Sequence, residues 1–122
     1  MDMYREIILD HYKHPHNFGH LKKPTYTGTL FNSACGDKIT MEVQMDTKGT
    51  VSDVRFSGVG CAISQASASM LTVEIKGKTK KEIMQLTSED IFSLLGTELT
   101  PSRVKCAVLP LEVLQKIVAG AV

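Results

Sequence analysis

The middle of the chain switches from strand to helix within residues 54–63, which read VRFSGVGCAI. Gly58 and Gly60 end the extended segment, because glycine adopts backbone conformations that interrupt a strand. Beyond this point apolar side chains recur every three or four positions, at Ile63, Ala66, Met70 and Val73. The spacing predicts a helix that ends at Gly77 and has Cys61 at its N-terminus. Exposed backbone amides at a helix N-terminus stabilise negative charge on a thiol.

The residues before this switch alternate in polarity, which predicts strands. Apolar residues alternate with polar ones over Ile39, Thr40, Met41, Glu42, Val43, Gln44 and Met45. Residues 46–49, Asp-Thr-Lys-Gly, have the composition of a turn, and Val54 and Phe56 then fall on one face of a returning strand. With extended sequence from Thr25 onward, this pattern predicts an antiparallel sheet of about three strands with one buried face and one solvent-exposed face.

The N-terminal residues 2–13 predict a short amphipathic helix, because Met3, Ile7 and Ile8 recur at helical spacing. The helix should end before Pro15, since proline disfavours helix at the preceding residue. We expect residues 1–23 to form a docking or mobile arm. Four histidines lie in this arm: His11, His14, His16 and His20. We expect them to face partners or to belong to the mobile arm, and not to form a second metal site, because proline and glycine interrupt any regular geometry.

The C-terminal part predicts two short helices and a longer one. Thr79 with Glu82 has the spacing of a capping box, and residues 87–90 offer another helix start before the break at Gly96. The last helix carries apolar residues on one stripe: Val104, Val108, Leu111 and Val118. Either it begins with Thr100-Pro101 and kinks near Cys106, where Pro110 removes a backbone hydrogen bond, or it begins near Pro110.

Length and composition indicate a single domain over residues 1–122, with 43% hydrophobic residues and a formal net charge of +1. This charge balance argues against an electrostatic grip on nucleic acid or anionic lipid. We find no apolar run of roughly 20 residues and no basic head followed by an apolar stretch, so we expect a soluble cytoplasmic protein. An odd number of cysteines without a secretion signal favours reduced, reactive or metal-bound thiols over disulfides.

The three cysteines, Cys35, Cys61 and Cys106, are each expected near the end of a strand or helix. In a small sheet with helices on one face, such ends can meet at one rim. Three thiolates and the carboxylate of Asp37 would make a four-donor site suited to zinc or to an iron–sulfur cluster. Asp37 could instead be only a turn residue. Lys105 is either a solvated charge or a site residue that stabilises the Cys106 thiolate or pairs with Asp37.

These residues carry a resemblance to a known family. The motifs are residues 34–37 (Ala-Cys-Gly-Asp), 56–64 around Cys61 and 103–106 (Arg-Val-Lys-Cys), preceded by residues 4–13 and 17–19. In this order, and over nearly the whole chain, they resemble the U-type iron–sulfur cluster assembly scaffolds, the family of IscU, SufU and the N-terminal domain of NifU. The resemblance implies an α+β fold of the SufE/NifU type, with helices packed on a three-stranded antiparallel sheet.

The resemblance also implies a function. Such a scaffold is not an enzyme: it assembles a [2Fe-2S] cluster from iron and from sulfur that a cysteine desulfurase delivers as persulfide, and it passes the cluster to apo-proteins or carrier proteins. A homodimer sharing a cluster is also implied. By the family's pattern Cys35, Asp37, Cys61 and Cys106 hold the metal or cluster, Asp37 keeps the cluster labile, and Cys106 is the leading candidate for the first sulfur acceptor.

Two features leave an alternative open. Lys105 stands where IscU-type scaffolds carry histidine, and in this it resembles SufU, in which zinc occupies the site and the protein relays sulfur. SufU chains, however, have an insertion between the second and third cysteine motifs that this sequence lacks. The alternative is a zinc-dependent sulfur-transfer protein that accepts persulfide from a cysteine desulfurase. Residues 99–105 also differ from the IscU segment that a dedicated chaperone recognises, so that interaction is not assumed.

Overall fold

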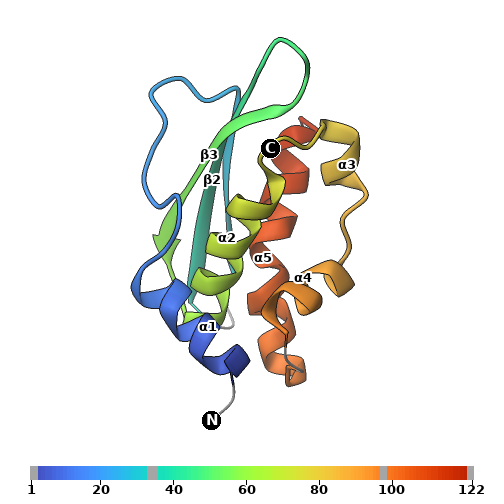
Figure 1. Ribbon diagram of the computed structural model, residues 1–122. Helices are drawn as coiled ribbons and strands as arrows, with labels where there is room; N and C mark the ends of the chain where they lie inside the picture. Colours follow the sequence, from blue (N-terminus) through green and yellow to red (C-terminus); the bar gives the residue numbers. More distant parts are fainter. Residues whose placement is uncertain (1–2, 33–35, 97–98, 121–122) are drawn as a thin grey trace.

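The computed structural model describes residues 3–32, 36–96 and 99–120. These ranges form, in chain order, α1 (Met3–Lys13), β1 (Tyr26–Asn32), β2 (Asp37–Met45), β3 (Val51–Val59), α2 (Ala62–Ile75), α3 (Lys80–Met84), α4 (Ser88–Leu95) and α5 (Pro101–Val118). The strands form an antiparallel sheet in the order β1-β2-β3, and the helices pack on it, so the predicted α+β fold is confirmed (Figure 1). No helix within these ranges is both long enough and apolar enough to cross a membrane.

The buried face of the central strand β2 follows the predicted alternation. Ile39, Met41 and Val43 point to one face and are fully buried, because α2 and α5 cover that face (Figure 1). The predicted turn closes the β2–β3 hairpin, and Asp46 stabilises it by accepting hydrogen bonds from the backbone amides of Lys48 and Thr50. The largest fully buried side chains come from both layers: Phe56, Leu71, Ile75, Ile83, Ile91, Leu95 and Leu114. The core therefore lies between the sheet and the helices.

The prediction that Glu42 lies on the solvent-exposed face of the sheet is wrong. Its side chain is buried, because the segment after α1 returns over this part of the sheet. Nδ1 of His20 lies 2.7 Å from one carboxylate oxygen of Glu42, and the amide of Leu21 donates to the other at 2.9 Å. The same segment bonds to the free edge of β3, where Gly19 donates to the Phe56 carbonyl at 2.9 Å. A stretch distant in sequence thus satisfies a carboxylate that alternation alone assigned to solvent.

Helix α2 begins after Cys61 as predicted, but its surroundings differ from a simple amphipathic helix. Val73, expected on the apolar stripe, is 51% exposed. Most other α2 residues are buried, including the polar Ser64, Ser67, Ser69 and Thr72, because α1, α4, α5 and β3 surround the helix. The apolar stripe in the sequence did not predict which α2 residues are buried, because a helix surrounded by other elements has no single solvent-exposed face.

The short helices α3 and α4 confirm both capping predictions. Oγ1 of Thr79 accepts from the amide of Glu82, and the Glu82 carboxylate accepts from the amide of Thr79. The hydrogen bond from the Thr79 backbone to the carboxylate, with a smaller contribution from the Thr79 side chain, lowers the pKa of Glu82. A second capping box starts α4, and Gly96 ends that helix with a left-handed φ of 70°.

Helix α5 decides between the two versions of the last helix. It begins at Pro101, with Thr100 at the N-cap position, and continues through Pro110 to Val118. The version in which the helix starts near Pro110 is therefore wrong. Proline fits the first turn of a helix because its missing N–H has no intrahelical role there. Cys106 consequently lies inside the helix, in its second turn.

Candidate metal centre

Cys61 is positioned by the tight passage from β3 into α2. At Gly58 φ is 136°, and a β-carbon there would lie 1.9 Å from the Lys38 carbonyl oxygen, so only glycine allows the strands to approach this closely. Cys61 occupies the N-cap position of α2 with an extended backbone, and its side chain makes no capping hydrogen bond. The sulfur therefore does not cap the helix, and it lies 3.9 Å from Oγ of Ser64 in the first turn of α2.

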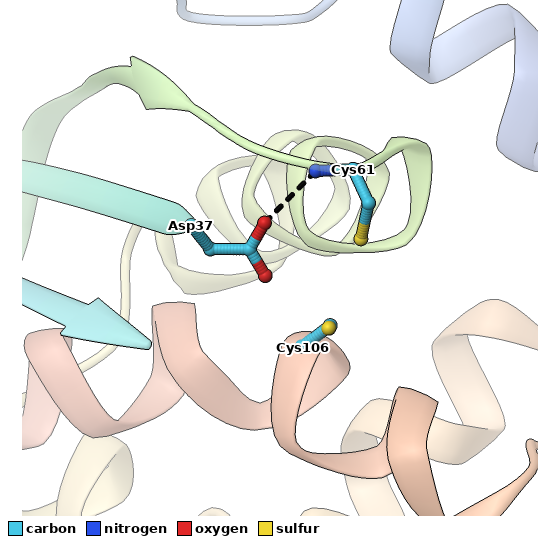
Figure 2. Close-up of side chains that lie close together, drawn as sticks. All are labelled: Asp37, Cys61 and Cys106. Carbon is cyan, nitrogen blue, oxygen red and sulfur yellow. Dashed lines mark hydrogen bonds between the residues drawn. The ribbon is translucent and has the colours of Figure 1, made fainter. Parts of the chain in front are cut away.

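Asp37 is the first residue of β2 and lies with its side chain on the helix-covered side of the sheet. It is 1% exposed. Its Oδ1 accepts a hydrogen bond from the backbone amide of Cys61 at 2.9 Å (Figure 2). Its Oδ2 is buried and has no hydrogen-bond partner among the described residues. An unpaired buried carboxylate oxygen is costly, so this atom is available as a ligand donor.

Cys106 brings the third donor from α5. Its side chain is 1% exposed and faces Asp37 and Cys61, which approach from β2 and from the start of α2 (Figure 2). One carboxylate oxygen of Asp37 and the two sulfurs all lie within 4.8 Å of one another. Ligands held at about 2.0–2.3 Å from a single tetrahedral ion are separated by about 3.5–4 Å, so only a small contraction would bring these atoms to bonding distance. Two thiols and a carboxylate fit zinc, and they also fit iron with sulfide.

Two neighbours of the site hold its donors in place. A β-carbon at Gly60 would lie 2.5 Å from Oδ1 of Asp37 and 2.5 Å from Oγ of Ser64. Ser64 is fully buried and donates to the Cys61 carbonyl at 3.1 Å. Sequence reasoning used Gly60 only as a strand end and did not single out Ser64. The proximity of both residues to Cys61 was the available signal, but only the fold shows that Asp37 fills the space beside Gly60.

The remaining predicted site residues have different outcomes. Cys35 lies outside the described residues, so its role stays a prediction. Lys105 is exposed and lines a pocket of about 320 Å³ with Phe31, Asn32, Leu109 and Glu112. Oδ2 of Asp37 has no hydrogen-bond partner in the described part of the chain, so Lys105 does not pair with this oxygen, and a site role for Lys105 stays a prediction.

The histidines of the N-terminal segment make hydrogen bonds. Nδ1 of His11 lies 2.7 Å from Oγ of Ser69, and the backbone amide of His16 donates to the same oxygen at 2.8 Å. Burial, with a smaller effect of neighbouring His16, lowers the pKa of His11, and Asp10 opposes the shift. Within the described ranges, the one cluster of three or more metal-ligating side chains is Asp37, Cys61 and Cys106.

Comparison with known proteins assigns the family. The family model of the NifU-like N-terminal domain matches residues 3–120, a range that contains all three donors and nearly the whole chain. This chain belongs to the NifU-like N-terminal domain family. The match confirms the resemblance drawn from the three cysteine motifs.

Relatives of this NifU-like domain carry two kinds of name. The zinc-dependent sulfurtransferase SufU of Bacillus subtilis is 38% identical over 96% of this chain and 90% of its own length. The iron–sulfur cluster assembly scaffold protein IscU of Aquifex aeolicus is 39% identical over 91% of this chain and 71% of its own. Among solved structures, an iron–sulfur cluster assembly scaffold protein for the SUF system from Fervidobacterium islandicum has a TM-score of 0.81 and 30% identity, covering 93% of this chain and 94% of its own.

Proposed function

We propose that this NifU-like domain is a scaffold that assembles a [2Fe-2S] cluster and transfers it to apo-proteins. The observation that carries the proposal is the convergence of the Asp37 carboxylate with the sulfurs of Cys61 and Cys106, all within 4.8 Å, where Oδ2 of Asp37 is buried without a partner. The names of the IscU relative and of the solved SUF-system protein support the same function. Cys35, two residues before Asp37, is the fourth donor in this proposal.

A site that combines thiolate ligands with a carboxylate suits a cluster that must be released to another protein. Thiolates are soft ligands with high affinity for iron in clusters, whereas a carboxylate is a hard oxygen ligand that holds such iron less firmly than a fourth thiolate would. Asp37 can supply this weaker bond without losing its place, because Oδ1 stays bonded to the Cys61 amide while Oδ2 meets the iron. The carboxylate is thereby held at the site in both the loaded and the empty protein.

The thiols would also receive sulfur from the cysteine desulfurase. A thiolate of the scaffold attacks the outer sulfur of the desulfurase persulfide, the S–S bond of that persulfide breaks, and the desulfurase cysteine leaves as a thiolate. Cys106 is the proposed acceptor, but it is 1% exposed, whereas Cys61 is partly exposed. Acceptance by Cys106 therefore requires the start of α5 to move when the desulfurase binds.

A zinc-dependent sulfur relay is the second candidate, and it has its own support. The Bacillus subtilis relative is named a zinc-dependent sulfurtransferase, and Lys105 precedes the third cysteine. Against it, the alignment with that relative extends over 134 positions, more than the 122 residues of this chain, so the relative has residues with no counterpart here. We place the scaffold first because the shorter chain matches the scaffold pattern.

Anaerobic reconstitution separates the two candidates. The protein is incubated with ferrous iron, cysteine, a thiol reductant and a cysteine desulfurase, and the visible absorption is recorded. A scaffold gives the charge-transfer bands of a [2Fe-2S] cluster, and the cluster then activates an apo-ferredoxin. A colourless protein that retains zinc, accelerates desulfurase turnover and carries persulfide on one cysteine would reject the scaffold in favour of the relay.

A further inference from the structure

The two described thiols lie on different helices, so their separation depends on how α2 and α5 are fixed against each other. Cys61 precedes the first turn of α2, and Cys106 lies inside α5. Apolar packing between helices has little directional preference, and a slide of one ångström would move one sulfur away from the other. A directional contact near both thiols would fix this distance.

Ser67 makes such a contact. Its hydroxyl donates a 2.6 Å hydrogen bond to the carbonyl of Ala107, the residue next to Cys106. Ser67 is 2% exposed and Ala107 is fully buried, so water does not compete for the bond. A carbonyl oxygen has two lone pairs and can accept this bond together with its helical one. Ser67 lies six residues after Cys61, about 9 Å along the α2 axis, so the bond joins the two thiol-bearing segments through short, rigid stretches of helix.

Pro110 makes the hydrogen bond from Ser67 to Ala107 more important for α5. Proline has no backbone N–H and cannot donate the helical hydrogen bond to the carbonyl of Cys106. The turn of α5 that carries the thiol therefore has less internal support than the rest of the helix. The hydrogen bond from Ser67 reaches α5 in this same turn, at the neighbouring carbonyl.

The hydroxyls of Ser69 and Thr72 on α2 make contacts on a different side of the helix. Oγ of Ser69 contacts His11 and the backbone of His16, and Thr72 is bonded to the side chain of Asn17. These contacts hold the N-terminal segment and do not reach α5. Ser67 and Ser69 are thus two buried serines on one helix, one directed to the thiol-bearing helix and one directed away from it.

We infer that Ser67 is a positioning residue of the metal centre, which sets the separation of the Cys61 and Cys106 sulfurs through its hydrogen bond to Ala107. The inference rests on the proposed role of these thiols as ligands, but it holds equally for a cluster scaffold and for a zinc relay. Loss of the hydroxyl should loosen metal binding by about ten-fold or more, the usual effect of removing a group that orients a ligand. The same loss at Ser69 should leave metal binding unchanged.

The test compares Ser67→Ala with Ser69→Ala. Cobalt(II) is titrated into each reduced protein, and the thiolate-to-cobalt and ligand-field absorption bands report affinity and geometry. Zinc affinity is measured by competition with a chromophoric chelator, and denaturant unfolding of the metal-free proteins reports stability. We expect both variants to lose stability to a similar extent, and only Ser67→Ala to bind zinc and cobalt about ten-fold more weakly with shifted ligand-field bands.

The outcomes separate this inference from the function on which it rests. Wild-type affinity and spectra in Ser67→Ala would overturn the positioning role while leaving the site intact. Equal loss of affinity in both serine variants would also overturn it, because affinity would then follow stability alone. A wild-type protein that shows no thiolate-to-cobalt band would contradict the proposed metal centre itself.

Discussion

Two aspartates at opposite ends of the β2 strand have opposite surroundings. Asp46, in the hairpin turn, is exposed and accepts hydrogen bonds from the Lys48 and Thr50 amides and, at 2.6 Å, from the Thr50 hydroxyl. Asp37, at the other end, is 1% exposed and uses one oxygen for the Cys61 amide while the other has no partner among the described residues. The hairpin turn lies at one end of the sheet and the helix N-terminus beside Asp37 at the other (Figure 1).

The difference agrees with the role proposed for each carboxylate. Asp46 satisfies backbone amides that the turn would otherwise leave unpaired, and its charge remains in water, so it stabilises the fold at little cost. Asp37 has lost its hydration without full replacement, which destabilises the metal-free fold. A cation at Oδ2 removes that penalty. We therefore expect changes at the Asp37 end to act on metal binding, and changes at the Asp46 end to act on stability alone.

The largest expected effect, on both zinc affinity and stability, comes from filling the space beside Asp37. In Gly60→Ala the new β-carbon would lie 2.5 Å from Oδ1 of Asp37, so the carboxylate must shift from its position beside the sulfurs. We expect zinc affinity to fall by about 100-fold and the unfolding free energy to fall by about 1–3 kcal/mol. Chelator competition and denaturant unfolding measure the two quantities.

Gly49→Ala is the matched control at the turn end. Gly49 has a φ of 81°, and a β-carbon there would meet no atom within 4 Å, so the variant is strained but not crowded. It should lose about 1–2 kcal/mol of stability and keep wild-type zinc affinity. If the two glycine variants weakened zinc binding equally, the division between the two ends of the sheet would be incorrect.

Replacing the carboxylates themselves should have a smaller effect on stability, with opposite signs at the two ends. Asp37→Ala removes the buried carboxylate oxygen that has no hydrogen-bond partner among the described residues, so the metal-free protein should gain about 1 kcal/mol in unfolding free energy. The reconstituted cluster should live longer or transfer more slowly to apo-ferredoxin, because the weakest ligand is gone.

Asp46→Ala provides the control for Asp37→Ala. It should lower stability, because the turn amides lose their acceptor, and it should leave cluster lifetime and transfer unchanged. A marked destabilisation of the metal-free protein by Asp37→Ala, together with unchanged cluster lifetime, would mean that Asp37 has only a structural role.

The smallest expected effect is a pH dependence of stability that comes from Asp46 in the hairpin turn. Hydrogen bonds from the Thr50 side chain and backbone lower the pKa of Asp46 below its ordinary 3.8. A carboxylate with a lowered pKa in the folded state stabilises the protein above the unfolded value and loses this contribution as pH falls through the folded value. The stability difference between wild type and Asp46→Asn should thus be constant near neutral pH and shrink below pH 3.8. A difference that stayed constant throughout acid unfolding would refute this assignment.

Local patterns in the sequence predicted much of the fold. The buried face over residues 39–45, the turn at 46–49 and the Thr79–Glu82 capping box each depend on neighbouring residues, and each appears as expected. Cys61 at the N-cap of α2 follows from the same kind of local signal. Long-range contacts were not predictable in this way: Glu42 is buried by His20 and Leu21, which alternation within one strand cannot show.

The candidate site was predicted in composition but not in detail. The cysteine motifs named Asp37, Cys61 and Cys106, and the structure brings all three together. The sequence did not show where the Lys105 side chain points. That depends on the residue at which α5 begins, and Pro110 allowed two starting points. The hydrogen bond from Ser67 to Ala107 depends on how two helices pack, which neither helix encodes alone.

X-ray absorption at the zinc edge of protein loaded anaerobically with one equivalent of zinc tests the central claim most directly. The account predicts sulfur scatterers at about 2.3 Å together with an oxygen at about 2.0–2.2 Å, and loss of that oxygen contribution in Asp37→Ala. A first shell of nitrogen and oxygen alone would contradict it, because the metal would then be bound away from Cys61 and Cys106.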